Sequence, residues 1–389
     1  MLSVLKRARK SLGQIVVAAT AALLAACTPA TTPLGGGGGT GKVQVALLVP
    51  GGSGQASDEL LATSLENAAR MAIADLGNAQ IDLRVYKTAG QPAQAAALAT
   101  QAVNEGAQII LGPVYAQEAN AAGVAVAGSG VNVLAFSNNT DIAGNNVFVL
   151  GPTFANTANR LASFAVRAGK TKIMIVHDRN TAGEIGRAAI QGGVDRAGGL
   201  VVATASYEFS QNGVVQAAPT IVATARSAGA QAVFLTADTA GALPLVTQLL
   251  ADNGLPPAMT QYIGLTRWDI PAATLALPGA QGGWFALPDP TLYQQYQARY
   301  TGMFGEAPHP ISGLAYDGMA AIGALTQQAG GGIIGKASLT QPNGFVGVNG
   351  VFRLLPDGSN ERALAVAQVQ NGAAVVLDPA PRSFGGAGF

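Results

Sequence analysis

The sequence predicts an α/β fold made of two doubly wound parallel-sheet lobes joined by several hinge crossings. Short apolar runs alternate with segments of helical period from residue 43 onward, which is typical of parallel βαβ units with helices on both faces of a sheet. The alternation breaks at residues 146–152, which indicates a crossing, and then starts again, so a second lobe of similar size is expected. With 389 residues, of which 49% are hydrophobic, the chain is long enough to form both cores.

The first lobe is expected to contain four strands and three helices. In the first helical segment, Leu61, Leu65 and Ala68 share one face, while Glu66 and Arg70 lie elsewhere, which is the pattern of a helix that packs on a sheet. The strand candidates are short apolar runs of the kind that parallel sheets bury on both faces. Strands are predicted at 43–49, 81–86, 108–111 and 132–137, and helices at 58–76, 92–105 and 117–127.

The second lobe is expected to repeat this alternation, and the chain then to return. Helices are predicted at 153–168, 183–197, 215–228 and 240–251, and strands at 172–176, 201–207, 232–235 and 260–264. The apolar segment 282–287 is expected to run back to the first lobe, where helices 291–304 and 311–328 would pack. The tail 344–376 alternates apolar and polar residues and carries Pro356-Asp357-Gly358, which indicates an antiparallel hairpin.

These elements give a set of expected boundaries. Residues 43–150 and 282–343 would form lobe 1, residues 151–281 and 344–381 would form lobe 2, and residues 382–389 would be a tail. Residues 27–42 are rich in Thr and Pro and then in Gly, which predicts a solvated tether.

The first 26 residues have the composition of a secretory signal peptide. Basic residues lie between Lys6 and Lys10, an apolar run follows at 12–24, and small residues precede Cys27, the one cysteine of the chain. The apolar run is shorter than a membrane-spanning helix needs. A single cysteine also excludes an intrachain disulfide.

Several function classes are disfavoured by charge and motif. A formal net charge of +1 provides no basic stripe for nucleic acid. The loop Gly52-Ser53-Gly54 fails the dinucleotide pattern, because Ser57 stands where its last glycine is needed. It also fails the serine-hydrolase pattern, because Gln55 stands where that pattern needs glycine. With two histidines in the chain, a catalytic base is scarce and a metal site is not expected. We therefore expect no enzyme activity and no cofactor.

A binding cleft is the better expectation, because ligands of open α/β sheets sit outside the carboxyl ends of the strands. For an amino-acid ligand, Ser137 would hold the carboxylate, Asp178 or Asp238 the ammonium, and Tyr115 would close over the side chain. The alternatives are that Ser137 only caps a helix and that both aspartates are solvated turn residues. The candidate cleft residues are Ser53, Tyr115, Ser137, Asn138 and Asn139 from lobe 1, with Asp178, Asp238 and Thr266 from lobe 2.

The sequence also carries two family resemblances. Leu24-Ala25-Ala26-Cys27 resembles a bacterial lipobox, which implies acylation of Cys27, and Thr28 after it implies outer-membrane sorting. The order of Ala46-Leu47-Leu48-Val49-Pro50, Ile110-Leu111-Gly112-Pro113, Phe136-Ser137-Asn138 and Tyr316-Asp317-Gly318 resembles the type I periplasmic solute-binding proteins of the Leu/Ile/Val type.

The tail 344–376 resembles one particular group within the type I periplasmic solute-binding proteins. Gly350-Val351-Phe352-Arg353-Leu354, followed by Asn360-Glu361-Arg362-Ala363, is similar to the end of the penicillin-binding-protein activator lipoproteins of the LpoA type. Those activators carry a helical-repeat domain before the two-lobed domain, and here only the tether precedes Val43. The resemblance implies a lipid-anchored, non-catalytic regulator of peptidoglycan synthesis whose partner is a penicillin-binding protein. The alternative is an ABC-transporter substrate-binding lipoprotein for an amino acid or similar small polar solute, whose partner is an ABC permease.

Overall fold

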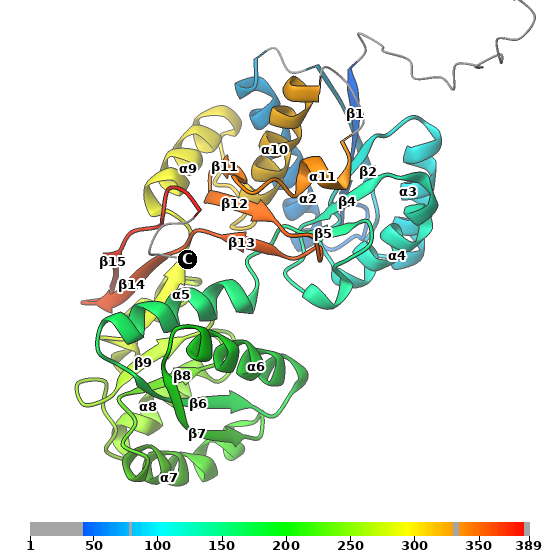
Figure 1. Ribbon diagram of the computed structural model, residues 1–389. Helices are drawn as coiled ribbons and strands as arrows, with labels where there is room; N and C mark the ends of the chain where they lie inside the picture. Colours follow the sequence, from blue (N-terminus) through cyan, green and yellow to red (C-terminus); the bar gives the residue numbers. More distant parts are fainter. Residues whose placement is uncertain (1–41, 78–79, 330–333, 385–389) are drawn as a thin grey trace, which may run out of the picture. The chain divides into compact units, whose positions relative to one another are not determined.

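The strands that the structure describes form three sheets, two of which are built on parallel strands (Figure 1). The structure is a computed structural model, which describes residues 42–77, 80–329 and 334–384. These residues belong to a single compact unit spanning 41–389. The prediction of an α/β fold with two parallel-sheet lobes is confirmed.

The first sheet has the order β2-β1-β3-β4-β5, and each neighbouring pair is parallel. All seven residues of β1 are buried, as expected for a central strand covered on both faces. Its strands are β1 Val43–Val49, β2 Ile81–Lys87, β3 Ile109–Leu111, β4 Asn132–Ala135 and β5 Val147–Val149.

Helices cover both faces of the first sheet (Figure 1). Side chains alternate along a strand, so Val45 and Leu47 face one core with α2 and α10, whereas Ala46 and Leu48 face another with α3 and α4. The helices are α2 Ala56–Asp75, α3 Pro92–Asn104, α4 Ala116–Val126 and α10 Gly313–Ala329.

Gly112 fixes the loop that follows β3. Its φ is +88°, and a Cβ there would lie 2.2 Å from the carbonyl oxygen of Leu48 on β1. Glycine is the residue that tolerates both this left-handed backbone and this close approach. The loop that leads from Gly112 to α4 is therefore held against the carboxyl end of β1.

The second sheet has the order β15-β14-β10-β9-β8-β6-β7. The run from β7 to β10 is parallel, and β14 and β15 add to it in antiparallel orientation. The strands are β6 Lys172–Asp178, β7 Leu200–Tyr207, β8 Ala232–Leu235, β9 Gln261–Gly264, β10 Trp284–Leu287, β14 Ala365–Gln370 and β15 Ala373–Asp378.

The second sheet is also covered on both faces (Figure 1). Ile173, Ile175 and Phe234 pack in one core with α5 and α6, while Val176 and Val233 pack in the other with α7 and α8. The helices are α5 Phe154–Arg167, α6 Thr181–Arg196, α7 Gln211–Ser227 and α8 Leu243–Asp252.

The predicted crossing at residues 282–287 is wrong. The sequence predicts that residues 282–287 run back to the first lobe, but Trp284–Leu287 form β10, which pairs with β9 and β14 in the second sheet. The reason is that the segment is apolar on both faces. Trp284 packs in the core of α5 and α6, where its ring lies 4.9 Å from that of Phe164, and Phe285 packs in the core of α7 and α8.

The return to the first sheet comes after β10. Helices α9 Pro290–Phe304 and α10 place Tyr296, Tyr300 and Met319 in the core of the first sheet, which confirms the predicted packing of these two helices. The short helix α11 Lys336–Leu339 follows and contributes Leu339 to the same core.

The tail divides between two sheets. Strands β11 Phe345–Gly347, β12 Gly350–Leu354 and β13 Asn360–Arg362 form a small antiparallel sheet, with the predicted turn between β12 and β13 closed by Leu355 N–H on Ser359 O at 2.8 Å. Phe345 and Phe352 pack in the core of the first sheet, whereas β14 and β15 belong to the second. The sequence pattern groups all of 344–381 with lobe 2. Which exact residues bound the two lobes stays a prediction.

Candidate functional site

The two parallel sheets share one winding pattern. The order β2-β1-β3-β4-β5 in the first corresponds to β7-β6-β8-β9-β10 in the second. In each, the strand order reverses between the first strand and the third, and ligands of doubly wound sheets bind beside the carboxyl ends at such a point. The loops that follow these strands carry the candidate residues predicted from the sequence.

Three segments carry the chain between the two sheets. They contain Pro152 before α5, Pro288 before α9 and Leu364 before β14. Hydrogen bonds tie the first and third together. The amide of Asn360 donates to the carbonyls of Val149 at 2.7 Å and Gly151 at 2.9 Å. We call these segments the three crossings.

A buried ion pair braces the third crossing. Arg362 Nη1 lies 2.9 Å from Asp317 Oδ2, and Arg362 Nε donates to the carbonyl of Leu150 at 2.5 Å. Asp317 also accepts from the backbone N–H of Val348 at 2.8 Å and from the amide of Asn349 at 3.0 Å. Both members of the Glu361-Arg362 step thus have partners inside the protein, because Glu361 pairs with Arg353.

Beside a small cavity of about 120 Å³ that Arg267 and Arg362 line, two larger adjoining cavities lie at the crossings, and both sheets contribute to them. Their volumes are about 190 Å³ and about 410 Å³, and both are lined by Asn138 and Phe154. We call them together the interlobe cavity. Its residues come from helices α5 and α6, from strand β10, from loops that follow strands of both sheets and from all three crossings. They are Asn138, Asn139, Thr140, Pro152, Thr153, Phe154, Ala155, Thr157, Ala182, Ile185, Ala189, Leu265, Thr266, Arg267, Ala286, Leu287, Pro288 and Leu364.

Three of the sequence-predicted candidates line the interlobe cavity. Asn138 is exposed to it, Asn139 lines the larger part, and Thr266 lines the smaller part. Asn139 also accepts from the backbone N–H of Asp141 at 2.8 Å. Thr266 lies in the loop after β9, 3.4 Å from the carbonyl of Ala237. The structure therefore brings together candidates from the two lobes.

Ser137 lies next to this cavity but is turned inward. Its side chain is buried, and its hydroxyl oxygen accepts from the backbone N–H of Asn139 at 3.1 Å. Its carbonyl accepts from the backbone N–H of Gly151 at 3.0 Å, in the first crossing. In this arrangement Ser137 shapes the loop that presents Asn138 and Asn139.

Ser53 and Tyr115 belong to a different part of the first sheet's edge. Ser53 accepts from the backbone N–H of Gln55 at 3.1 Å, and Tyr115 donates from its hydroxyl to Asp58 at 2.6 Å. The bond to the Asp58 carboxylate raises the pKa of Tyr115 to about 12. Neither side chain lines the interlobe cavity.

The two aspartates differ from each other. Asp178 ends β6 and is buried, with the hydroxyl of Tyr207 donating to it, and this burial raises the pKa of its carboxyl. It is therefore not the solvated turn residue that the sequence favoured. Asp238 is exposed and accepts from the backbone N–H of Gly241 at 2.5 Å. Neither lines the interlobe cavity.

Sequence reasoning predicted a crossing at 146–152, which contains Pro152, but it missed the other residues of the crossings. Phe154 and Leu364 line the interlobe cavity, and Pro152 and Pro288 flank it. A signal was present for Pro288, since it directly follows the apolar segment 282–287. Phe154 had no such signal, because a large apolar residue at the start of a helix is normally assigned to a core.

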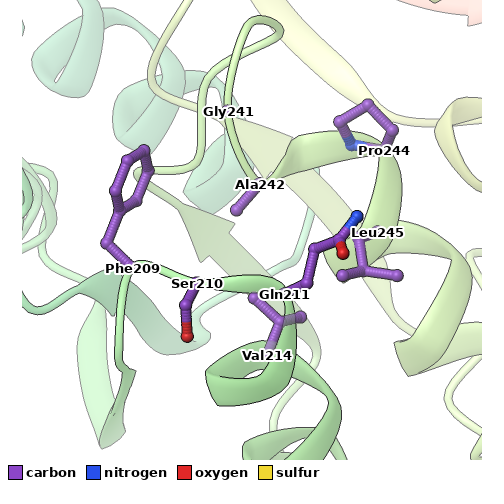
Figure 2. A pocket seen from close by; sticks show the side chains of 8 residues that line it. All are labelled: Phe209, Ser210, Gln211, Val214, Gly241, Ala242, Pro244 and Leu245. Carbon is purple, nitrogen blue, oxygen red and sulfur yellow. The ribbon is translucent and has the colours of Figure 1, made fainter.

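Figure 2 shows another cavity, of about 350 Å³, between the starts of α7 and α8. The ring of Phe209 lies on one side, and Pro244 and Leu245 lie on the other. Its lining is mostly apolar and shares no residue with the interlobe cavity. None of the sequence-predicted candidates lines it.

The described residues show neither a metal cluster nor a membrane-spanning helix. Within them, no group of three His, Cys, Asp or Glu side chains is placed to hold a metal ion. Among the helices that the structure describes, none has the length and apolar character that a membrane crossing needs. Cys27, the signal peptide and the tether up to residue 41 lie outside the described residues.

Solved structures share this fold. A putative branched-chain amino acid ABC transporter protein from Rhodospirillum rubrum is 17% identical, with 87% of this chain and 100% of that chain covered and a TM-score of 0.73. A substrate-binding protein from Desulfitobacterium hafniense, in complex with Leu, is 17% identical, with 86% and 100% covered and a TM-score of 0.65. A solute-binding protein from Rhodopseudomonas palustris, in complex with 3,4-dihydroxybenzoic acid, is 19% identical, with 88% and 97% covered and a TM-score of 0.59.

At these identities the solved structures show a shared fold. A search of curated protein sequences gave no significant match. The family model described as periplasmic binding protein matches residues 42–374, which include every described helix and both large sheets apart from residues 375–378 of β15. The chain therefore belongs to the periplasmic binding protein family.

Proposed function

We propose that this protein is the substrate-binding component of an ABC importer and holds a small solute in the interlobe cavity. The observation that carries the proposal is that the cavity is lined from both sheets and from all three crossings. A solute in that position would contact both lobes, so it would favour closure of one lobe on the other. Family membership implies a periplasmic location.

The solved structures support transport more than regulation. The neighbours named above are described as ABC transporter or solute-binding proteins, and two of them contain small ligands. The activator hypothesis depended on the lipobox, the tether and the Glu361-Arg362 tail. Since Arg362 pairs with Asp317 and Glu361 with Arg353, the tail has an internal role that needs no outside partner.

A thermal-shift screen tests the transport proposal. Purified residues 42–389 are heated with a library of amino acids, organic acids, amides and sugars. A solute at 100 times its Kd stabilises the folded state by about 2.7 kcal/mol, which is a clear shift in Tm. A flat response to every class would contradict the proposal. A co-purification from envelope extracts that enriches a peptidoglycan synthase would restore the activator hypothesis.

We further propose that Cys27 is acylated and anchors the protein to the envelope, with the Gly-rich tether between the anchor and Val43. Labelling with palmitate should mark the native protein and not Cys27→Ala, which should move to the soluble periplasmic fraction. The resemblance to lipoproteins sorted to the outer membrane is tested by Thr28→Asp, which should relocate the labelled protein to the inner membrane. Retention of Cys27→Ala in the membrane fraction would contradict the anchor.

A further inference from the structure

The interlobe cavity has an unusual balance of charge. Among the described residues that line it, Arg267 is the single charged side chain, and Asp and Glu are missing from the lining. The polar remainder consists of Asn and Thr side chains. A cavity of this composition offers donors to an anion, but it has no carboxylate to receive a cation.

Arg267 keeps part of its guanidinium free. Nε donates to Asp269 Oδ1 at 2.9 Å and Nη2 donates to Asp269 Oδ2, whereas Nη1 has no partner in the described part of the chain. Asp269 lines a different cavity, on the side of Tyr293, and not the interlobe cavity. Arg267 lines both this cavity and the interlobe cavity, so the arginine of the ion pair reaches the solute space, whereas Asp269 does not line it.

Two helices also begin at this cavity. Helix α5 starts at Phe154 with Thr153 as its N-cap, and both residues line the cavity together with Ala155. Helix α6 starts at Thr181, and Ala182 lines the same space. A helix start carries positive partial charge, equivalent to about +0.5, which favours an anion and opposes an ammonium group.

The nearby carboxylates are engaged elsewhere. Asp178 is buried against the hydroxyl of Tyr207, and Asp238 accepts from the backbone N–H of Gly241. An ammonium group that entered the cavity would lose its water without gaining an ion pair, which is unfavourable. The aromatic and aliphatic members of the lining, Phe154, Ile185, Leu265, Leu287 and Leu364, would instead contact an apolar body.

We propose that the solute is a small apolar carboxylic acid without an amino group, and that Arg267 binds its carboxylate. This rests on the proposed function, and it departs from the amino-acid ligand expected from the sequence. The Asn138 amide supplies further donors, and the apolar lining holds the hydrocarbon part. The fold itself does not decide the ligand, since neighbours of this fold contain either Leu or 3,4-dihydroxybenzoic acid.

A matched ligand series tests the ligand class. Residues 42–389 are titrated at neutral pH with 4-methylpentanoate, 4-methyl-2-oxopentanoate, L-leucine and 4-methylpentanamide, which share one branched skeleton. A second series uses benzoate, 3-phenylpropanoate, L-phenylalanine and benzamide. Binding is measured by calorimetry and by tryptophan emission, because buried Trp268 follows Arg267 directly in the chain. The carboxylates are expected to bind, and the amino acids and amides to bind at least tenfold more weakly.

Variants then test the role of Arg267. Arg267→Gln should weaken binding of the best carboxylate roughly tenfold or more, since a charge-assisted hydrogen bond is lost. Asn138→Ala provides a second variant, at an exposed position where the fold is not at risk, and should weaken it less. Arg70→Gln is the matched control, because Arg70 is exposed on α2 and pairs with Glu66. The Tm of each variant without ligand shows whether it is folded.

The results of these binding experiments distinguish failure of the proposed ligand class from failure of the proposed transport function. Binding of L-leucine or L-phenylalanine as tight as that of its carboxylate partner would overturn the inference and leave the transport proposal standing. Unchanged affinity in folded Arg267→Gln would overturn the role of Arg267. A protein that binds other solutes but none of these carboxylates would overturn the ligand class. A protein that binds no solute at all would overturn the proposed function as well.

Discussion

The Arg362 guanidinium lies 2.9 Å from the Asp317 carboxylate, and both side chains are almost inaccessible to solvent. Phe352 packs on the guanidinium, with its ring centre 4.7 Å from Arg362 Cζ. A neighbouring pair on the same small sheet, Arg353–Glu361, has side chains that are 29% and 37% exposed. The two arginine–carboxylate pairs differ strongly in burial, and each arginine also donates to one backbone carbonyl, Arg362 to that of Leu150 and Arg353 to that of Pro342.

We expect Arg362→Met to lower the free energy of unfolding by about 3–5 kcal/mol, because Asp317 would be left as a buried charge without its cation. The matched control Arg353→Met removes the exposed pair and should cost about 1 kcal/mol or less. Urea denaturation of both variants measures the difference. Equal losses would show that burial does not set the strength of these pairs.

Glu118 is a second residue whose burial has a measurable consequence. Its side chain is fully buried at the start of α4, and neither carboxyl oxygen has a hydrogen-bond partner in the described structure. Burial raises the pKa of this carboxyl. A carboxyl whose pKa is higher in the folded state than in the unfolded state lowers stability above the folded pKa, and this penalty disappears below the unfolded pKa.

Glu118→Gln should therefore be more stable than the native protein at pH 7–8, by about 1–3 kcal/mol. The advantage should shrink as the pH falls through the raised pKa and vanish below the ordinary glutamate value of 4.5. Glu105→Gln should behave in the opposite way, since the hydroxyl of Tyr86 lowers the pKa of the exposed Glu105 carboxyl. Thermal melts between pH 4 and pH 8 test both signs.

At the level of elements, helix α5 begins where the first crossing ends. Thr153 accepts from the backbone N–H of Asn156 at 3.2 Å, and Asn156 accepts from the backbone N–H of Thr153 at 2.9 Å, which is a reciprocal cap. The amide of Asn156 also donates to the carbonyl of Asn360 at 2.9 Å. The cap therefore joins the start of the helix to the segment that leads into the third crossing.

Thr153→Ala should destabilise the protein by about 1–2 kcal/mol, because the first turn of α5 loses its capping oxygen. The matched control is Thr100→Ala within α3, where Thr100 is exposed and donates to the carbonyl of Ala96. That substitution should stay within about 0.5 kcal/mol of the native value. Equal losses in the two variants would indicate that the cap contributes nothing.

At the scale of the whole molecule, the interlobe cavity and the cavity of Figure 2 are two alternative sites for a solute. Occupation of the interlobe cavity should slow hydrogen exchange in segments 138–140, 153–157 and 265–267, because both lobes contact the solute. Exchange in 209–214 and 241–245, which line the cavity of Figure 2, should not change. Mass spectrometry with the solute that gives the largest thermal shift measures both. Protection confined to the Figure 2 segments would place the binding site there instead.

The local sequence was sufficient for most elements of the two sheets. Strand β1 falls on the predicted residues, and α3 and α7 differ from their predictions by a few residues at the ends. Short apolar runs and helical periodicity depend on residues close in sequence, so they can be read from the chain. The Pro356-Asp357-Gly358 turn is local in the same sense and is confirmed.

The sequence could not decide between partners that are far apart in the chain. An apolar run such as 284–287 fits either sheet, and its pairing with β9 and β14 placed it in the second. For the site, the sequence identified strand-end residues, and Asn138, Asn139 and Thr266 do meet in one cavity. It could not foresee that Asp178 is enclosed by Tyr207, or that Phe154 and Leu364 complete the lining. The sequence by itself determined the elements and the fold class, because these follow from local periodicity. The tertiary structure decided which side chains share the cavity, because segments such as 138–140 and 265–267 lie more than a hundred positions apart in the chain. It also decided which charged side chains are paired, because those contacts form only in the folded chain.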